Sequence, residues 1–187
     1  LTDGFRIFTE GVPTPEYSPP SLPTPSPPAE VTIHIGVVCV DSGSLESKSG
    51  VGVCFGANDA QNVGAWLPME NSTTKYEAEL VAATIAVRAV PPDTPVLLIS
   101  RNDSVATAMN KHLNIWEDKG WVGVQNPVPA QQLALYLRSR SALTSFAKPT
   151  SASTSALCCS AKDLARTAIT ESIGPVLSIK RLRGRLV

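Results

Sequence analysis

Three acidic residues lie at positions suited to holding a divalent metal ion. Asp41 directly follows a β-branched run, and Asp103 follows a short apolar run. Glu79 lies deep within the apolar face of an alanine-rich segment that has helical spacing. Carboxylates at strand ends and on one helix face are held rigidly enough to meet at one ion. Mg²⁺ prefers such oxygen ligands, so we expect these three side chains to converge on a divalent metal.

The elements that would position these acids can be outlined from the residue pattern. β-branched and glycine-punctuated runs predict strands at residues 31–40, 50–55, 62–67 and 96–99. Short polar turns join the first three, which favours an antiparallel meander. Thr73 or Thr74 can cap the helix that carries Glu79, with Glu77 completing a capping box after Thr74. Pro91 and Pro92 should end that helix.

The second half of the chain predicts further helices and one weak segment. Helical candidates lie at residues 105–116, 131–143 and 161–172, whereas residues 146–160 are rich in Ser, Thr and Ala and indicate a poor strand or a loop. A strand, helix and strand in sequence favour a right-handed crossover within a mixed sheet. We therefore predict an α/β fold, with a five-stranded mixed sheet, its first three strands antiparallel, and helices on both faces.

Composition bounds the organisation of the 187-residue chain. Residues 1–30 form a proline-rich linker or disordered arm, because residues 12–28 hold eight of the sixteen prolines. Residues 31–172 are expected to form one domain, followed by a basic tail at 173–187. The formal net charge is zero, so nucleic-acid binding must depend on a local patch.

The cellular location and the type of metal site can be predicted from patterns that are absent from the sequence. It has no signal peptide and no apolar run long enough to cross a membrane, which predicts an intracellular protein of the cytoplasm or nucleus. The four cysteines have no CxxC spacing, so a zinc site is not expected and the thiols should be reduced. The sequence does not indicate an oligomeric state.

Several short motifs together resemble the type 1 ribonuclease H family, in particular the domains found with fungal retroelement-like genes. The similarity extends over about residues 31–168. The motifs are VDSGS at residues 40–44, GVGV at 50–53, TTKYEAEL at 73–80, KHL at 111–113 and WEDKGW at 116–121. The spacing of the two tryptophans around a glycine is the most specific of these.

The resemblance implies a ribonuclease H-like fold and an endonuclease that hydrolyses the RNA strand of RNA–DNA hybrids. Family members use four acids and two Mg²⁺ ions, and Mn²⁺ is an alternative. The two ions activate a water molecule and stabilise the leaving oxygen. On the matching positions, the resemblance assigns catalysis and metal binding to Asp41, Glu79, Asp103 and Asp163.

The resemblance also implies a surface that binds the hybrid. One part is the helix N-terminus, where hydroxyls and free N–H groups favour phosphate, and the other is a patch of cations and aromatic rings. The residues are Asn71, Ser72, Thr73, Thr74, Lys111, Trp116, Lys119 and Trp121. The alternative interpretation of the two tryptophans is simple core packing.

The chain departs from the family pattern in ways that support two other functions. An ungapped alignment puts Arg101 and Lys162 at expected acid positions, and Asp103 and Asp163 fit only after small shifts. Residues 149–160 contain no histidine where the family has a histidine loop. The first alternative is therefore a catalytically degenerate domain that binds nucleic acid. The second is a protein-interaction module that uses the proline-rich arm.

Overall fold

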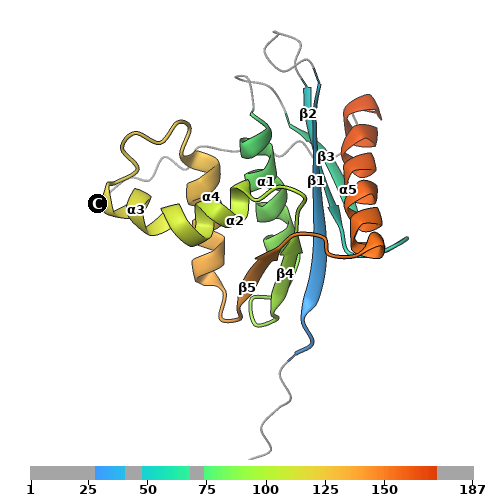
Figure 1. Ribbon diagram of the computed structural model, residues 1–187, viewed down its shortest axis with the longest axis horizontal. Coiled ribbons are helices and arrows are strands. Elements are labelled where there is room, and N and C mark those ends of the chain that lie inside the picture. Colours follow the sequence, from blue (N-terminus) through green and yellow to red (C-terminus); the bar gives the residue numbers. More distant parts are fainter. Residues whose placement is uncertain (1–27, 41–47, 68–73, 172–187) are drawn as a thin grey trace, which may run out of the picture.

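The computed structural model describes residues 28–40, 48–67 and 74–171. They form one five-stranded sheet in the order β3-β2-β1-β4-β5, covered by helices on both faces (Figure 1). The strands are β1 (Val31–Val40), β2 (Lys48–Cys54), β3 (Val63–Leu67), β4 (Val96–Ile99) and β5 (Thr144–Ala147). The helices are α1 (Lys75–Arg88), α2 (Ser104–Thr107), the π-helical η1 (Ala108–His112), α3 (Leu113–Asp118), α4 (Val128–Ser139) and α5 (Ala152–Glu171).

The sheet is mixed, as the sequence predicted. Strand β1 pairs with β2 and β2 with β3 in antiparallel register, whereas β1–β4 and β4–β5 are parallel. Helix α1 provides the crossover between β3 and β4. The predicted α/β architecture is therefore confirmed, including the antiparallel first three strands.

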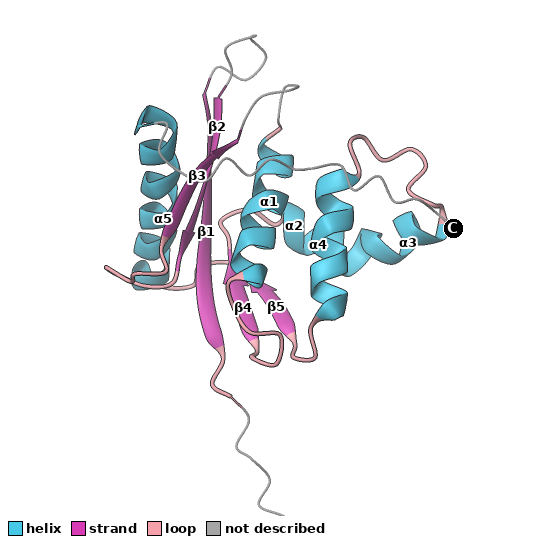
Figure 2. Cartoon of the chain, turned by 180° about the vertical axis from the view of Figure 1, so that it is seen from behind, coloured by secondary structure: helices cyan, strands magenta, loops and turns pink. Residues whose placement is uncertain are grey.

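The two faces of the sheet pack differently (Figure 2). Toward α1, strands β1 and β2 present large apolar side chains such as Ile33, Ile35 and Val51, all at most 3% exposed. Toward α5 the strands present glycines, and the helix lies directly on their backbone. A Cβ atom at Gly36 would lie 2.5 Å from the backbone nitrogen of Lys162. Small residues on both sides thus let the helix approach the strands closely.

The α5 face also buries His34, two residues before Gly36 and therefore on the same side of β1. Its side chain is 2% exposed, and neither ring nitrogen has a hydrogen-bond partner among the described residues. Burial lowers the pKa of His34, because the low-dielectric interior disfavours the charged imidazolium.

The first helix is bounded as the sequence indicated. The hydroxyl of Thr74 accepts a hydrogen bond from the Glu77 backbone N–H at 3.2 Å, and the Glu77 carboxylate accepts one from the Thr74 N–H at 2.7 Å. This capping box confirms Thr74, one of the two predicted caps. The helix ends at Arg88, before Pro91 and Pro92.

The prediction for residues 146–160 was wrong over most of its length. Strand β5 ends at Ala147, and α5 begins at Ala152, well before the predicted helix start at residue 161. The single helix predicted at 105–116 is three consecutive segments, α2, η1 and α3, and α4 begins three residues earlier than predicted. Residues 1–27 of the proline-rich arm predicted at 1–30, and the basic tail predicted at 173–187, lie outside the described residues. Over the residues that are described, no helix is long and apolar enough to span a membrane.

Candidate nucleic-acid interface

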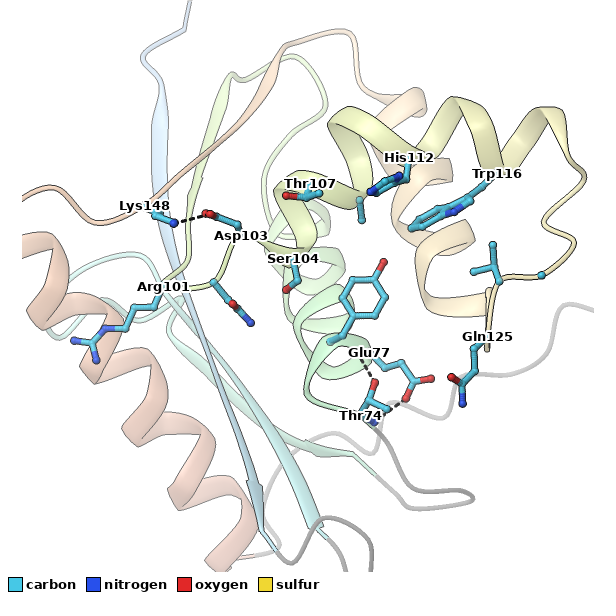
Figure 3. A pocket seen from close by; sticks show the side chains of 15 residues that line it. Thr74, Glu77, Arg101, Asp103, Ser104, Thr107, His112, Trp116, Gln125 and Lys148 are labelled. Carbon is cyan, nitrogen blue, oxygen red and sulfur yellow. Dashed lines mark hydrogen bonds and ion pairs between the residues drawn. The ribbon is translucent and has the colours of Figure 1, made fainter.

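A groove of about 640 Å³ separates the first turn of α1 from the helical segment α2–η1–α3 (Figure 3). Its lining is dominated by hydroxyl, amide and aromatic groups. They include Thr74, Tyr76, Thr107, His112, Trp116 and Gln125. We call this feature the groove. Such a lining offers hydrogen bonds and ring faces, which are the contacts that proteins use on nucleic-acid backbones and unpaired bases.

At the α1 end of the groove, both oxygens of one carboxylate accept hydrogen bonds. Glu77 is 8% exposed and accepts hydrogen bonds from the Thr74 backbone and from Nδ2 of Asn126, the latter at 2.7 Å. Asn126 has a positive φ of 43°, a conformation that asparagine tolerates better than most residues. Glu77 therefore fixes the loop after α3 against α1.

Tyr76 adds a hydroxyl to the groove lining that has no hydrogen-bond partner among the described residues. Burial raises the pKa of Tyr76, and the neighbouring Glu77 carboxylate raises it further. The phenol therefore remains protonated, as a hydrogen-bond donor, throughout the physiological pH range.

Three aromatic side chains form a row at the far wall of the groove. The His112 and Trp116 rings are stacked, with centroids 5.5 Å apart and planes inclined by 22°. Trp121, which has a positive φ of 65°, lies 5.9 Å from Trp116 in a tilted arrangement. Both tryptophans are partly buried against the core, so they pack internally while Trp116 also lines the groove.

A second, smaller pocket of about 120 Å³ lies beside Glu79, where β1, the end of β4, α1 and α5 meet. We call it the Glu79 pocket. Its apolar wall is formed by residues 35–37 of β1 and by Cys158. Its polar lining comprises Lys75, Glu79, Ser100, Arg101, Asn102 and Lys162. The groove and the Glu79 pocket share Arg101 and Asn102, so the two cavities adjoin.

Both carboxylate oxygens of Glu79 are engaged in hydrogen bonds. The Nδ2 group of Asn102 donates to Oε1 at 3.0 Å and to Oε2 at 3.2 Å, and the Ser104 hydroxyl donates to Oε2 at 2.5 Å. The side chain is buried, with 4% exposed. A buried carboxylate needs such donors, since an unpaired charge in the interior is costly. Residues 102 and 104 thus hold Glu79 in one orientation.

The Arg101 side chain points toward α5, away from the other labelled residues of the groove (Figure 3). Its guanidinium donates to the carbonyl and hydroxyl oxygens of Ser155, at 3.2 and 2.9 Å, and to the Cys159 sulfur at 3.0 Å. Burial raises the pKa of the adjacent Cys158 thiol, and Arg101 opposes this in part. Cys158 therefore stays a neutral thiol in the wall of the pocket.

Comparison with known proteins identifies the fold. No model of a protein family matches the chain, and no curated protein matches it. Solved structures do match, among them the foamy viral protease–reverse transcriptase in complex with dsDNA, with a TM-score of 0.59 and 18% identity over 75% of this chain and 94% of that chain. This chain has the ribonuclease H-like fold. LC9-RNase H1, a type 1 RNase H with the type 2 active-site motif, matches the ribonuclease H-like domain with a TM-score of 0.57 and 18% identity over 79% of this chain and 75% of that chain.

A third solved structure extends over more of this chain. It is the foamy viral protease–reverse transcriptase in complex with RNA/DNA hybrid, with a TM-score of 0.57 and 17% identity. The match covers 90% of this chain and 23% of that chain. The ribonuclease H-like domain thus corresponds to one part of that larger polypeptide.

Among the described residues of the ribonuclease H-like domain, the predicted acids do not lie together. Asp103 forms an ion pair with Lys148 at 2.5 Å and lines the groove rather than the Glu79 pocket (Figure 3). Asp163 is exposed and pairs with Arg166, one turn further along α5, at 2.5 Å. Of the four, only Glu79 is described within the Glu79 pocket.

Asp41, the remaining predicted acid, lies outside the described residues. Strand β1 is described as far as Val40, which is 42% exposed and pairs with Lys48. The β1 residues that line the Glu79 pocket are 35–37. Val40 is four residue steps along the strand from Gly36, a span of roughly 13 Å. The contact of Gly36 with the α5 backbone leaves no room for any side chain at position 36.

The described residues of the Glu79 pocket do not fit a magnesium site. Mg²⁺ requires an octahedral set of oxygen ligands, with protein carboxylates supplying the charge. Glu79 is the one carboxylate that lines this pocket, and its neighbours Lys75, Arg101 and Lys162 are cations. In the described ranges, no group of three His, Cys, Asp or Glu side chains is placed to hold a metal ion.

The predicted nucleic-acid contacts divide into three groups. Thr74 and Trp116 line the groove, whereas Lys111 and Lys119 are exposed on the neighbouring helical segment without lining it. Trp121 contacts Trp116 from behind. Asn71, Ser72 and Thr73 lie outside the described residues.

Sequence reasoning missed the polar partners of the site. Asn102 and Ser104 hold Glu79, Lys148 pairs with Asp103, and Lys75 lines the Glu79 pocket. The run Asn102–Ser104 directly after a short strand was a usable signal, because polar residues there face the neighbouring helix. Lys148 carried no comparable signal.

Proposed function

We propose that this ribonuclease H-like domain binds nucleic acid, in particular RNA–DNA hybrid duplexes, and does not cut it. The observation that carries the proposal is the charge of the Glu79 pocket, whose described lining contains three cations and one carboxylate that is already hydrogen-bonded. A centre of this kind repels divalent metal ions and attracts phosphate.

Support for a nucleic-acid ligand comes from the groove. Hydroxyl and amide groups of Thr74, Thr107 and Gln125 suit phosphate and sugar oxygens, and the half-buried ring of Trp116 suits a base or sugar face. The foamy viral protease–reverse transcriptase, which has a domain of similar fold, is described in complex with dsDNA and with RNA/DNA hybrid. A-form geometry is recognised through backbone and 2′-OH contacts across a wide minor groove, which matches a lining rich in hydroxyl and amide groups.

The competing candidate is a Mg²⁺- or Mn²⁺-dependent endonuclease that cuts the RNA strand of the hybrid. The buried, firmly oriented Glu79 favours it, because such rigidity is what a metal ligand needs. Asp41 would have to supply a second carboxylate. Asp103 and Asp163 would have to leave Lys148 and Arg166 to complete the set.

A binding and cleavage experiment on the full chain separates the two. A fluorescent RNA–DNA hybrid is titrated with protein in EDTA, and the integrity of the RNA strand is followed separately in millimolar Mg²⁺. We expect saturable binding in EDTA, no cleavage in Mg²⁺, and an affinity about tenfold weaker in Trp116→Ala, since one stacking contact contributes roughly 1–3 kcal/mol.

Glu79→Gln serves as the matched control for the same experiment. It keeps the shape of the side chain and removes its charge. We expect hybrid binding to persist with an affinity equal to or higher than that of the unmodified chain, because the substitution removes a negative charge from the lining of the pocket. RNA cleavage in Mg²⁺ that disappears in Glu79→Gln would refute the proposal and establish the endonuclease.

A further inference from the structure

Two lysines reach the Glu79 pocket from separate elements. Lys75 is the first residue of α1, and Lys162 lies in the middle of α5. Neither forms an ion pair with any residue in the described ranges. Arg101, the third cation of the lining, is engaged with Ser155 and Cys159 on α5. Among the described residues, Lys75 and Lys162 are therefore the lining cations that are not engaged in an ion pair or hydrogen bond with another side chain.

The remaining groups of the pocket do not neutralise that charge. Among the described residues, Glu79 is the only carboxylate in the lining, and its oxygens accept hydrogen bonds from Asn102 and Ser104. With three cations and one carboxylate, this described lining carries an excess of two positive charges. Ser100 contributes a hydroxyl whose oxygen accepts the Asn102 backbone N–H at 3.2 Å, which leaves the hydroxyl proton free to be donated.

Size and position restrict the ligand. The pocket has about 120 Å³, less than a fifth of the volume of the groove, which suits one small oxyanion rather than a nucleoside. It adjoins the groove along Arg101 and Asn102, which line both cavities. A strand that lies in the groove can therefore direct one of its phosphates into the pocket.

We propose that the Glu79 pocket is a metal-free phosphate site, in which Lys75 and Lys162 bind one backbone phosphate directly and the Ser100 hydroxyl donates a hydrogen bond to it. Lysine ammonium groups bind phosphate as compact point charges and need no bridging ion. The source of the phosphate, a nucleic-acid strand, rests on the proposed function. The anion site itself does not, because it depends only on the charge of the pocket.

The probe that tests the site is inorganic phosphate. The ¹⁵N-labelled full chain is titrated at constant ionic strength, with chloride replaced by phosphate, and amide shifts are followed around residues 36, 75, 100 and 162. We expect saturable shifts confined to these amides. The double variant Lys75→Gln/Lys162→Gln should weaken phosphate binding by about tenfold or more, because each charged hydrogen bond contributes roughly 1.5–3 kcal/mol.

Two further variants serve as controls for the phosphate titration. Arg166→Gln removes an exposed cation of α5 that is paired with Asp163 away from the pocket, and it should bind phosphate like the unmodified chain. Lys75→Arg/Lys162→Arg retains both charges and should retain binding. Non-saturable shifts, or equal loss in Arg166→Gln and in the lysine double variant, would overturn the phosphate site.

Hybrid titrations of the same variants separate this proposal from the preceding one. A chain that binds hybrid but shows no saturable phosphate shifts refutes the phosphate site and leaves nucleic-acid binding intact. A chain that binds phosphate in the pocket but no hybrid refutes the nucleic-acid function and leaves the anion site intact.

Discussion

The groove and the Glu79 pocket adjoin, yet they depend on the sequence in different ways. The groove lies between the first turn of α1 and the segment α2–η1–α3, and its lining varies among hydroxyl, amide and aromatic groups. The chemistry of the pocket depends on a few side chains after β4 and on α1 and α5, where Lys75, Arg101 and Lys162 share the described lining with Glu79. A groove with such a varied lining keeps its character after most single substitutions. In the Glu79 pocket, by contrast, two or three substitutions are enough to reverse the net charge.

The contrast is sharpest at Gly36, where the fold itself prevents a side chain from entering the pocket. Gly36→Ala would place a Cβ atom 2.5 Å from the Lys162 nitrogen and 2.7 Å from the Ala161 carbonyl carbon. Both atoms belong to the backbone and cannot move independently of α5. We expect a loss of about 3 kcal/mol or more in the free energy of unfolding, at the upper end of overpacking effects, measured by chemical denaturation.

Gly56→Ala is the control for that substitution. A Cβ atom at position 56 would meet only the Cβ of Asp59, at 4.0 Å. The free energy of unfolding should therefore change by less than about 0.5 kcal/mol. Equal stability of Gly36→Ala and Gly56→Ala would show that α5 does not lie on the β1 backbone, and the contrast between the two cavities would lose its structural basis.

The second prediction reverses the charge of the Glu79 pocket by replacing two of its cations, of which Arg101 also lines the groove. The double variant Arg101→Asp/Lys162→Asp adds two carboxylates to Glu79 and leaves Lys75 as the remaining lining cation. We expect Mn²⁺ affinity, measured by electron paramagnetic resonance, to rise by about tenfold, since even at a high effective dielectric nearby charges interact by more than 1 kcal/mol. Hybrid affinity should fall, because two favourable charges for phosphate are lost.

Arg166→Asp makes the same kind of charge change on the exposed side of α5. It should leave Mn²⁺ affinity unchanged. If both the double variant and Arg166→Asp raised Mn²⁺ affinity equally, the effect would come from net charge rather than from the pocket.

The smallest expected effect contrasts two histidines. His34 is buried beneath α5 and has a lowered pKa because of that burial, whereas His112 is exposed in the groove. Below a pH of about 6.5 the unfolded chain binds a proton at His34 that the folded chain excludes, so stability falls as the pH falls, by no more than about 1.4 kcal/mol per pH unit. His34→Leu should flatten this dependence.

Denaturation of the unmodified chain, His34→Leu and His112→Leu at about pH 7.5 and pH 5.5 measures the effect. His112→Leu should keep the pH dependence of the unmodified chain. An unchanged slope in His34→Leu would mean that another group is responsible.

The fold was largely predictable because its signals are local. The β-branched run 31–40 is β1 to the residue, and the spacing of Thr74 and Glu77 located the start of α1. Residues 152–160 lack such a signal, and they belong to a helix that lies on the glycines of the sheet further along, at Ala161, Lys162 and Ala165. That contact joins distant parts of the chain and leaves no periodic apolar pattern.

The site was less predictable for the same reason. Glu79 was recognisable as an acid within an apolar helix face, but its partners Asn102 and Ser104 are 23 and 25 residues away. Whether Arg101 or Asp103 faces Glu79 could not be decided from spacing, because a change of one residue rotates a side chain to another face. In the structure neither contacts Glu79, and Asn102 lies between them.

The central claim is that the Glu79 pocket has no resident metal, and a Mn²⁺ titration tests it most directly. Mn²⁺ replaces Mg²⁺ at carboxylate sites and is detected by electron paramagnetic resonance. We predict that the full chain binds no Mn²⁺ in the pocket at concentrations up to about millimolar, the weak end of protein sites for hard divalent ions. One or two stoichiometric ions, lost in Glu79→Gln and in Asp41→Asn, would contradict the account.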